Sequence, residues 1–126
     1  MRVATLVDQP VVVGYHALAA GSVAPAEAPG RVLKGVGRHA VPVILLTRLG
    51  VDVSEQGRGL GRLLLRDALL GVAAAADVIG ARALLIHCED EDARAFYLHQ
   101  AEFEPSPTDP LHLFLVLGDL RRTLGR

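Results

Sequence analysis

Three glycines at alternate positions, Gly57, Gly59 and Gly61, separate two apolar segments of this chain. Residues 43–51, before the glycines, are almost continuously apolar and predict a buried central strand. Over residues 60–79, after them, apolar side chains recur at helical spacing. Glycines at a strand-to-helix turn let backbone N–H groups approach an anion, and the helix N-terminus adds partial positive charge. The chain is therefore organised around a turn that can bind a phosphate-bearing ligand.

The remaining segments predict a mixed α/β sheet. Residues 24–37 are rich in Pro, Gly, Ala and charge, which predicts a loop. The order strand, strand, helix, strand, helix, strand places the glycine turn at the carboxyl end of a strand. The additional elements are strands at residues 11–22, 83–87 and 111–117, and a helix that contains Phe96 and Tyr97 and is capped by Asp90 or Asp92.

Composition indicates one domain over residues 1–126. The chain is 51% hydrophobic with a mean hydropathy of +0.35, which suits a single core. No apolar run reaches about twenty residues, so no membrane span is expected. Cys88 is the only cysteine, which favours a reducing, cytoplasmic compartment. The net charge of −1 argues against a broadly basic nucleic-acid coat.

Two familiar phosphate-binding motifs fit the glycine run poorly. A Walker A loop needs Lys and Ser or Thr after its last glycine, but Arg62 and Leu63 follow Gly61. A dinucleotide-binding loop needs a glycine where Arg62 stands and an acidic residue at the end of the next strand, which ends in His87 and Cys88. A purely structural tight turn is the alternative that the glycines alone leave open.

Residues 49–64 resemble motif A of the GNAT acetyltransferases, whose pattern is Gln/Arg-x-x-Gly-x-Gly/Ala; Gln56, Gly59 and Gly61 fit it. The resemblance implies an α/β fold with a mixed, mainly antiparallel sheet, splayed central strands and flanking helices. It also implies that acetyl-CoA is the cosubstrate, with its pyrophosphate in the glycine loop and its pantetheine arm along the preceding strand. The residues expected to bind the coenzyme are Leu49, Gly50, Val51, Gln56, Gly57, Arg58, Gly59, Leu60, Gly61 and Arg62.

A narrower resemblance, to the GNAT toxins of bacterial toxin–antitoxin pairs, covers residues 14–23, 42–49 and 105–111. That family acetylates the α-amine of aminoacyl-tRNA, which blocks translation, and is neutralised by a ribbon-helix-helix antitoxin. The resemblance implies the same activity and partners here, and a homodimer. Family members usually carry a strand and two helices before the strand at Gly14, so the chain is expected to lack these N-terminal elements.

Two other functions are compatible with the residues. One is a GNAT enzyme that acetylates a small-molecule amine or a protein N-terminus. The other is a non-catalytic remnant that binds the coenzyme or an antitoxin.

Tyr97 is the expected catalytic acid. Residues 95–97 resemble the second GNAT signature, in which a tyrosine lies near the thioester sulfur. A positioned phenol can protonate the leaving thiolate, and backbone N–H groups near residues 49–51 can stabilise the oxyanion. Core packing of Phe96 and Tyr97 is the alternative.

No strong general base is evident. His87, Glu89 and Asp90 close a strand near the expected cleft and can relay a proton through water. The alternatives are a packing role for His87 and a helix-cap role for Asp90. No metal is expected, because the other histidines lack ligand spacing and are interpreted as surface or edge residues: His16, His39, His99 and His112.

Arg58, Arg62 and Arg66 follow one side of the helix after the glycines. Coenzyme phosphates or a tRNA are candidate ligands, and a solvated helix face is the alternative. Arg48 lies in the apolar strand, where an unpaired charge is costly to bury, which favours an interface or phosphate role.

Overall fold

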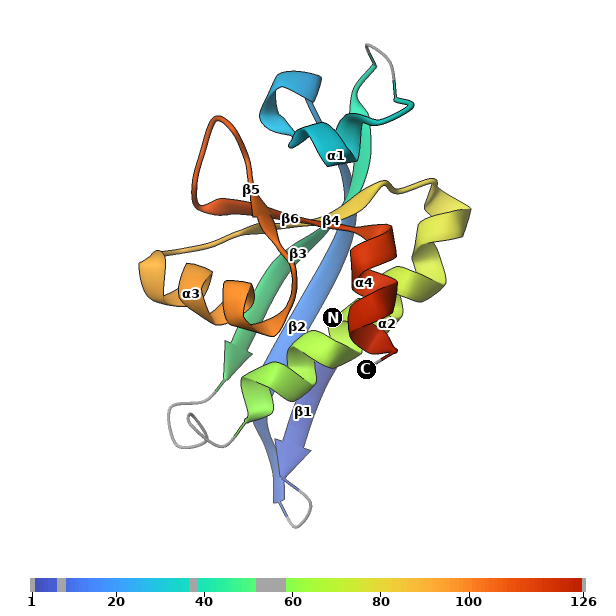
Figure 1. Ribbon diagram of the computed structural model, residues 1–126. Coiled ribbons are helices and arrows are strands. Elements are labelled where there is room, and N and C mark those ends of the chain that lie inside the picture. The colour runs from blue at the N-terminus through green and yellow to red at the C-terminus, as the bar shows by residue number, and fades with distance from the viewer. Residues whose placement is uncertain (1, 7–8, 37–38, 52–58, 126) are drawn as a thin grey trace.

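The computed structural model describes residues 2–6, 9–36, 39–51 and 59–125 (Figure 1). Within them the chain forms a single sheet flanked by helices. The strands are β1 (Arg2–Leu6), β2 (Gln9–Val23), β3 (Val41–Val51), β4 (Ala83–His87), β5 (Glu104–Pro105) and β6 (His112–Val116). The helices are α1 (Gly30–Leu33), α2 (Leu60–Ile79), α3 (Glu91–Gln100) and α4 (Leu117–Leu124), with a 3₁₀ turn at Pro25–Glu27.

The sheet has the order β1-β2-β3-β4-β6-β5, and only the pairing of β3 with β4 is parallel. β3 pairs with β2 along its whole length, from Val41 to Val51. Its pairing with β4 ends at Leu46 and Ile86, so the two strands separate beyond that point (Figure 1). The mixed, mainly antiparallel sheet with splayed central strands is thus confirmed.

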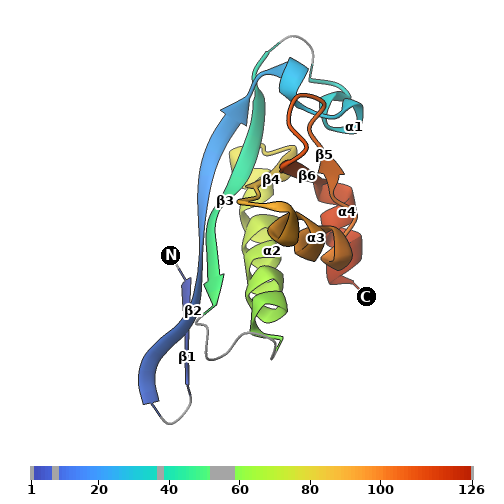
Figure 2. The same ribbon diagram turned by 90° about the vertical axis from the view of Figure 1, so that its left-hand side faces the viewer.

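The helices α2, α3 and α4 cover one side of the sheet (Figure 2). The periodicity of residues 60–79 is confirmed as α2, and Gly80 ends this helix with φ 76°. Ile44 and Leu46 of β3 and Leu84 of β4 contribute to the same apolar cluster. The buried stripe of α2 consists of Leu64, Leu65, Ala68, Leu69, Val72 and Ala76.

The other face of the sheet has a smaller core. Val43, Leu85 and Phe114 lie there and pack with Ala28 and Val32, from the segment that contains α1. Successive strand residues alternate between the faces, so each central strand contributes to both cores.

Four elements differ from the sequence prediction. The strands β1 and β5 and the helices α1 and α4 were not expected. Leu117, predicted to end the last strand, is instead the first residue of α4. Each of these elements is short, so its own periodicity is weak, and its conformation depends on pairing or packing with distant residues. Among the described residues no helix combines the length and apolarity needed to cross a bilayer.

A charged cluster joins α1, β5 and α4. The Asp119 side chain is 1% exposed and accepts two hydrogen bonds from Arg31, at 2.7 and 3.1 Å. Arg31 also donates to Glu104 at 3.1 Å, and Arg122 pairs with Asp119. A buried carboxylate is tolerated here because two guanidinium groups compensate its desolvation.

Asp119→Asn is expected to lower the free energy of unfolding by about 2 kcal/mol, because the buried side chain loses its charge-assisted hydrogen bonds from Arg31. Urea denaturation measures this difference. The matched control is Asp77→Asn, since Asp77 is 87% exposed and pairs with Arg121 at 3.2 Å. Its effect should stay below about 1 kcal/mol. Equal, small losses in both variants would contradict a stabilising role for the cluster.

Candidate active site

A cavity of about 100 Å³ lies where β3 and β4 separate. Residues 46–49 of β3 form one wall and residues 86–89 form the other. Ala93 and Tyr97 of α3 complete the lining. The cavity therefore lies at the carboxyl ends of two parallel strands, the usual location of ligand sites in α/β sheets.

A β-bulge shapes the wall that β3 provides. Ala17 of β2 pairs with Arg48 and Leu18 pairs with Leu46, so Thr47 is an extra residue, and its hydroxyl donates to the Ala17 carbonyl at 3.1 Å. The bulge breaks the alternation of side chains: Thr47 and Arg48 are both exposed. Arg48 is thus not buried within its strand, which removes the desolvation cost expected from the sequence.

Beyond the bulge, β3 has a strand partner on one side only. Leu49, Gly50 and Val51 pair with β2, and no described strand pairs with their other side. Alternate backbone groups there are available to an extended ligand that carries amides. A Cβ at Gly50 would lie 2.7 Å from the Tyr15 ring, so a larger residue at this position would clash with the ring where it packs beside β3.

The N-terminus of α2 is open to an anion. Gly59 is the N-cap residue with φ 81°, a conformation that favours glycine, and it has no side chain to cap the helix. Within the described part of the chain, no side-chain acceptor is recorded for the backbone N–H groups of the first turn, which contains Leu60, Gly61 and Arg62. The predicted ligand-binding residues Gln56, Gly57 and Arg58 lie outside the described residues.

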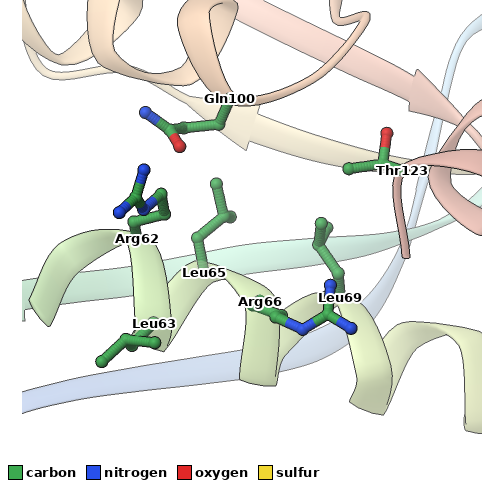
Figure 3. A pocket seen from close by; sticks show the side chains of 7 residues that line it. All are labelled: Arg62, Leu63, Leu65, Arg66, Leu69, Gln100 and Thr123. Carbon is green, nitrogen blue, oxygen red and sulfur yellow. The ribbon is translucent and has the colours of Figure 1, made fainter. Parts of the chain in front are cut away.

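A second cavity, of about 210 Å³, lies between α2, α3 and α4. Arg62 and Gln100 point toward one another across it, and Leu65 points into it from α2 (Figure 3). Arg66 instead donates to the Leu124 carbonyl at 3.3 Å and so contacts the end of α4. Of these two helix arginines, Arg62 is the one whose guanidinium has no partner among the described residues.

Tyr97 is packed in the apolar core and also lines the cavity. It is 7% exposed, and its ring packs edge-on against Phe96 and Phe103 at centroid distances of 5.2 and 6.0 Å. It also lines the cavity between β3 and β4. Burial, reinforced by Cys88 and Glu89, raises the pKa of Tyr97 to about 12. The phenol is therefore protonated near neutral pH and can act as a proton donor.

The groups that close β4 have distinct environments. Asp90 accepts from the Ala93 N–H at 2.8 Å, which confirms its predicted role as a helix cap. His87 stacks on His112 with ring centroids 3.9 Å apart. Burial, followed by the charge of His112, lowers the pKa of His87 below its ordinary value of 6.5. The predicted packing role of His87 is confirmed, and the contact is ring stacking on His112. The side chain is nevertheless exposed and lines the cavity.

Cys88 belongs to the apolar core on the same side as Tyr97. Burial raises the pKa of its thiol to about 11. A thiol that stays protonated is a poor nucleophile, so an acyl-cysteine mechanism is not supported. Among the described residues, no group of three His, Cys, Asp or Glu side chains is placed to hold a metal ion.

One histidine contradicts the sequence interpretation. His16 is 2% exposed, not on the surface, and its Nε2 lies 2.7 Å from Oδ2 of Asp67. Arg2 pairs with the same carboxylate at 3.3 Å. The arrangement fixes α2 to β1 and β2. The one sequence signal for the burial of His16 is its spacing: it lies two residues before Leu18 and therefore on the same face of the strand.

Alkylation of Cys88 tests whether its thiol is buried in the core beside the cavity. At pH 8 the folded chain should react with iodoacetamide about 100-fold more slowly than the urea-unfolded chain, because a pKa near 11 rather than 9.0 leaves that much less thiolate. Mass spectrometry over time measures both rates on the same single cysteine. Equal rates would mean that the thiol is not buried beside Tyr97.

Relatives of this chain share its sequence over most of its length. A Mycobacterium tuberculosis protein named tRNA-acetylating toxin is 59% identical over 114 residues, which cover 90% of this chain and 68% of the relative. A probable toxin TacT from Sinorhizobium fredii is 31% identical over 125 residues, covering 94% and 69%. No protein-family model matches the chain.

Solved structures agree in fold. AtaT complexed with acetyl-methionyl-tRNAfMet superimposes with a TM-score of 0.78 at 26% identity, covering 88% of this chain and 66% of AtaT. AtaTR bound with acetyl-CoA gives a TM-score of 0.72 at 26% identity, covering 88% and 65%. The chain thus spans about two thirds of the length of the proteins it matches. With the observed sheet and the identity to the mycobacterial protein, these findings place the chain in the family of GNAT-fold, tRNA-acetylating toxins.

Proposed function

We propose that this chain transfers the acetyl group of acetyl-CoA to the α-amine of an aminoacyl-tRNA. The observation that carries the proposal is the separation of β3 from β4, which opens a cavity with the protonated phenol of Tyr97 in its wall. The relatives support the substrate class, since one is named tRNA-acetylating toxin and another, AtaT, is complexed with acetyl-methionyl-tRNAfMet.

The coenzyme is proposed to follow β3 and end at α2. Its pantetheine amides pair with the free backbone edge of Leu49, Gly50 and Val51. Its pyrophosphate binds the glycine turn of Gln56, Gly57, Arg58 and Gly59 and the helix residues Leu60 and Gly61. The guanidinium of Arg62, which lines the second cavity, adds positive charge for the phosphates.

Tyr97 is the proposed catalytic acid. The amine nitrogen attacks the thioester carbonyl, charge develops on the carbonyl oxygen, and backbone N–H groups of β3 stabilise it. When the carbon–sulfur bond breaks, the phenol protonates the leaving sulfur. The support for this role is the position of the phenol in the cavity wall and not its acid strength, because a pKa of about 12 makes it a weaker acid than a thiol.

The finer aspects of its biology are also proposals. An antitoxin of the ribbon-helix-helix type is the expected protein partner, and a homodimer is the expected assembly. A cytoplasmic location agrees with the single cysteine of the sequence and with the presence of charged tRNA there.

Labelled acetyl-CoA and a panel of charged tRNAs test the function. The chain should transfer label to one or a few aminoacyl-tRNAs and to no uncharged tRNA, because the acceptor is the α-amine. Transfer only to small-molecule amines or peptide N-termini would overturn the proposed substrate class. Coenzyme binding without transfer to any amine would favour a non-catalytic role.

Tyr97→Phe should lower kcat about 100-fold or more, because the leaving sulfur loses its proton donor. The affinity for acetyl-CoA, measured by calorimetry, should change little. Phe96→Leu is the control for loss of aromatic packing on the same helix, and its kcat should stay near that of the unaltered chain. Normal turnover by Tyr97→Phe would remove the phenol from the mechanism.

Gly59→Val should abolish detectable acetyl-CoA binding, because a β-branched residue resists φ 81° and would shift the first turn of α2. Gly80→Val is the matched control: Gly80 caps the other end of the same helix with φ 76°, and open space surrounds its Cβ position too. The control should lose similar stability but keep its coenzyme affinity. Unchanged affinity in Gly59→Val, measured by calorimetry, would contradict the pyrophosphate placement.

A further inference from the structure

The proposed reaction releases a proton for which the mechanism so far has no acceptor. Forming the amide requires the α-amine to lose a proton, while the sulfur gains one from Tyr97. The following inference rests on the proposed function and concerns the group that accepts the proton from the amine.

Most polar groups around the cavity are unsuited to this role. The Cys88 thiol and the Tyr97 phenol stay protonated, because burial raises their pKa values to about 11 and about 12. Asp90 is engaged as the N-cap of α3, and the Thr47 hydroxyl donates to a carbonyl of β2. Among the described residues that line the cavity, His87 and Glu89 remain.

His87 and Glu89 act on different sides of the cleft. Glu89 raises the pKa of Tyr97, so its charge acts on the phenol, where the thiol leaves. His87 lies two residues after Leu85 and pairs with His112 of β6, two residues before Phe114. Strand alternation thus places both histidines on the sheet face of Leu85 and Phe114, opposite the core that contains Tyr97.

This placement separates the two proton-transfer groups across the sheet. The coenzyme, proposed to extend from β3 to α2, reaches the cleft from the side of the helices. On the opposite face, the exposed imidazole of His87 is available to an amine that enters the cavity from there. The proton donor for the sulfur and a proton acceptor for the amine then lie on the two sides of one thioester.

Burial, and after it the charge of His112, keeps the imidazole of His87 neutral near pH 7. His112 stacks on it, and the Nε2 of His112 lies 3.3 Å from Oδ2 of Asp109. Burial and His112 lower the pKa of His87, while Asp109 and Glu27 oppose the shift. The charged groups that share the cavity wall are Arg48 and Glu89. The net shift is downward, so the ring has a free lone pair at neutral pH.

We propose that His87 is the catalytic base that accepts the proton of the attacking α-amine, and that His112 is its positioning residue. The nitrogen–carbon bond forms, the carbon–sulfur bond breaks, and its electron pair leaves with the sulfur. Tyr97 supplies one proton to the sulfur and His87 takes one from the nitrogen. Solvent then takes the proton from His87 and restores that of Tyr97, so that the products are the amide and free coenzyme A.

His87→Gln is the first test, measured with the amine that the unaltered chain acetylates. Its kcat should fall about 100-fold, in the range typical of general bases, while acetyl-CoA affinity stays unchanged because the residue faces the acceptor side. His99→Gln is the matched control, since His99 is an exposed histidine of α3 outside the cavity lining, and it should keep full kcat. An unchanged kcat in His87→Gln would overturn the proposal.

Two further readouts separate catalysis from structure. In the unaltered chain kcat should rise with pH through the pKa of His87, below 6.5. His112→Gln removes a charge that lowers this pKa, so the rise should move to higher pH. In His87→Ala, added imidazole should restore part of the rate. The base assignment would be overturned if the pH dependence of kcat did not shift in His112→Gln and imidazole did not restore activity to His87→Ala. It would also be overturned if kcat fell in Glu89→Gln but not in His87→Gln.

The outcomes also distinguish this inference from the proposed function. Transfer to aminoacyl-tRNA that survives His87→Gln refutes only the role of His87. Transfer to another amine that depends on His87 refutes only the tRNA substrate. No transfer by the unaltered chain to any amine refutes both.

Discussion

The unequal length of the two pairings of β3 determines the candidate site. β3 stays paired with β2 as far as Val51, but its pairing with β4 stops at Leu46. A strand that loses one neighbour and keeps the other exposes a backbone edge inside the sheet without losing its own conformation. The cavity, the free edge and the route toward α2 all follow from this arrangement.

Strand alternation then assigns different chemistry to the two faces of the sheet. Cys88 lies with Tyr97 in the apolar core, where burial keeps both groups protonated. His87, one residue earlier, lies on the other face beside His112, where its ring stays neutral. His87 ends β4 and Cys88 follows it directly. Burial in the core keeps the Cys88 thiol protonated, whereas the His87 ring on the other face is neutral and can accept a proton.

The position of α2 relative to the sheet is fixed by both polar and apolar contacts. Asp67 binds His16 and Arg2, which attaches the helix to β1 and β2. One turn further along, a Cβ at Gly71 would come within 3.3 Å of Leu18, so the small residue allows close packing. These contacts direct the N-terminus of α2 toward the end of β3, as an anion site at that turn requires.

The sequence by itself determined the elements whose signals are local. The apolar period of residues 60–79 predicted α2, the apolar run before the glycines predicted β3, and Asp90 was a correct candidate for the cap of α3. Leu49, Gly50, Val51, Gly59, Leu60, Gly61, Arg62 and Tyr97 could be proposed from the motifs, and the structure places them around the cleft and the start of α2. The roles of Gln56, Gly57 and Arg58 stay predictions.

Only the tertiary structure decided the features that depend on distant residues. β1, β5, α1 and α4 are short, and each is held in its conformation by pairing or packing with distant residues. His16 is buried because Asp67, 51 residues away, reaches it from α2, and Arg48 is exposed because the bulge at Thr47 breaks the alternation of side chains along β3. His87 and His112 meet because β4 and β6 are neighbours, a pairing that neither strand's own sequence specifies.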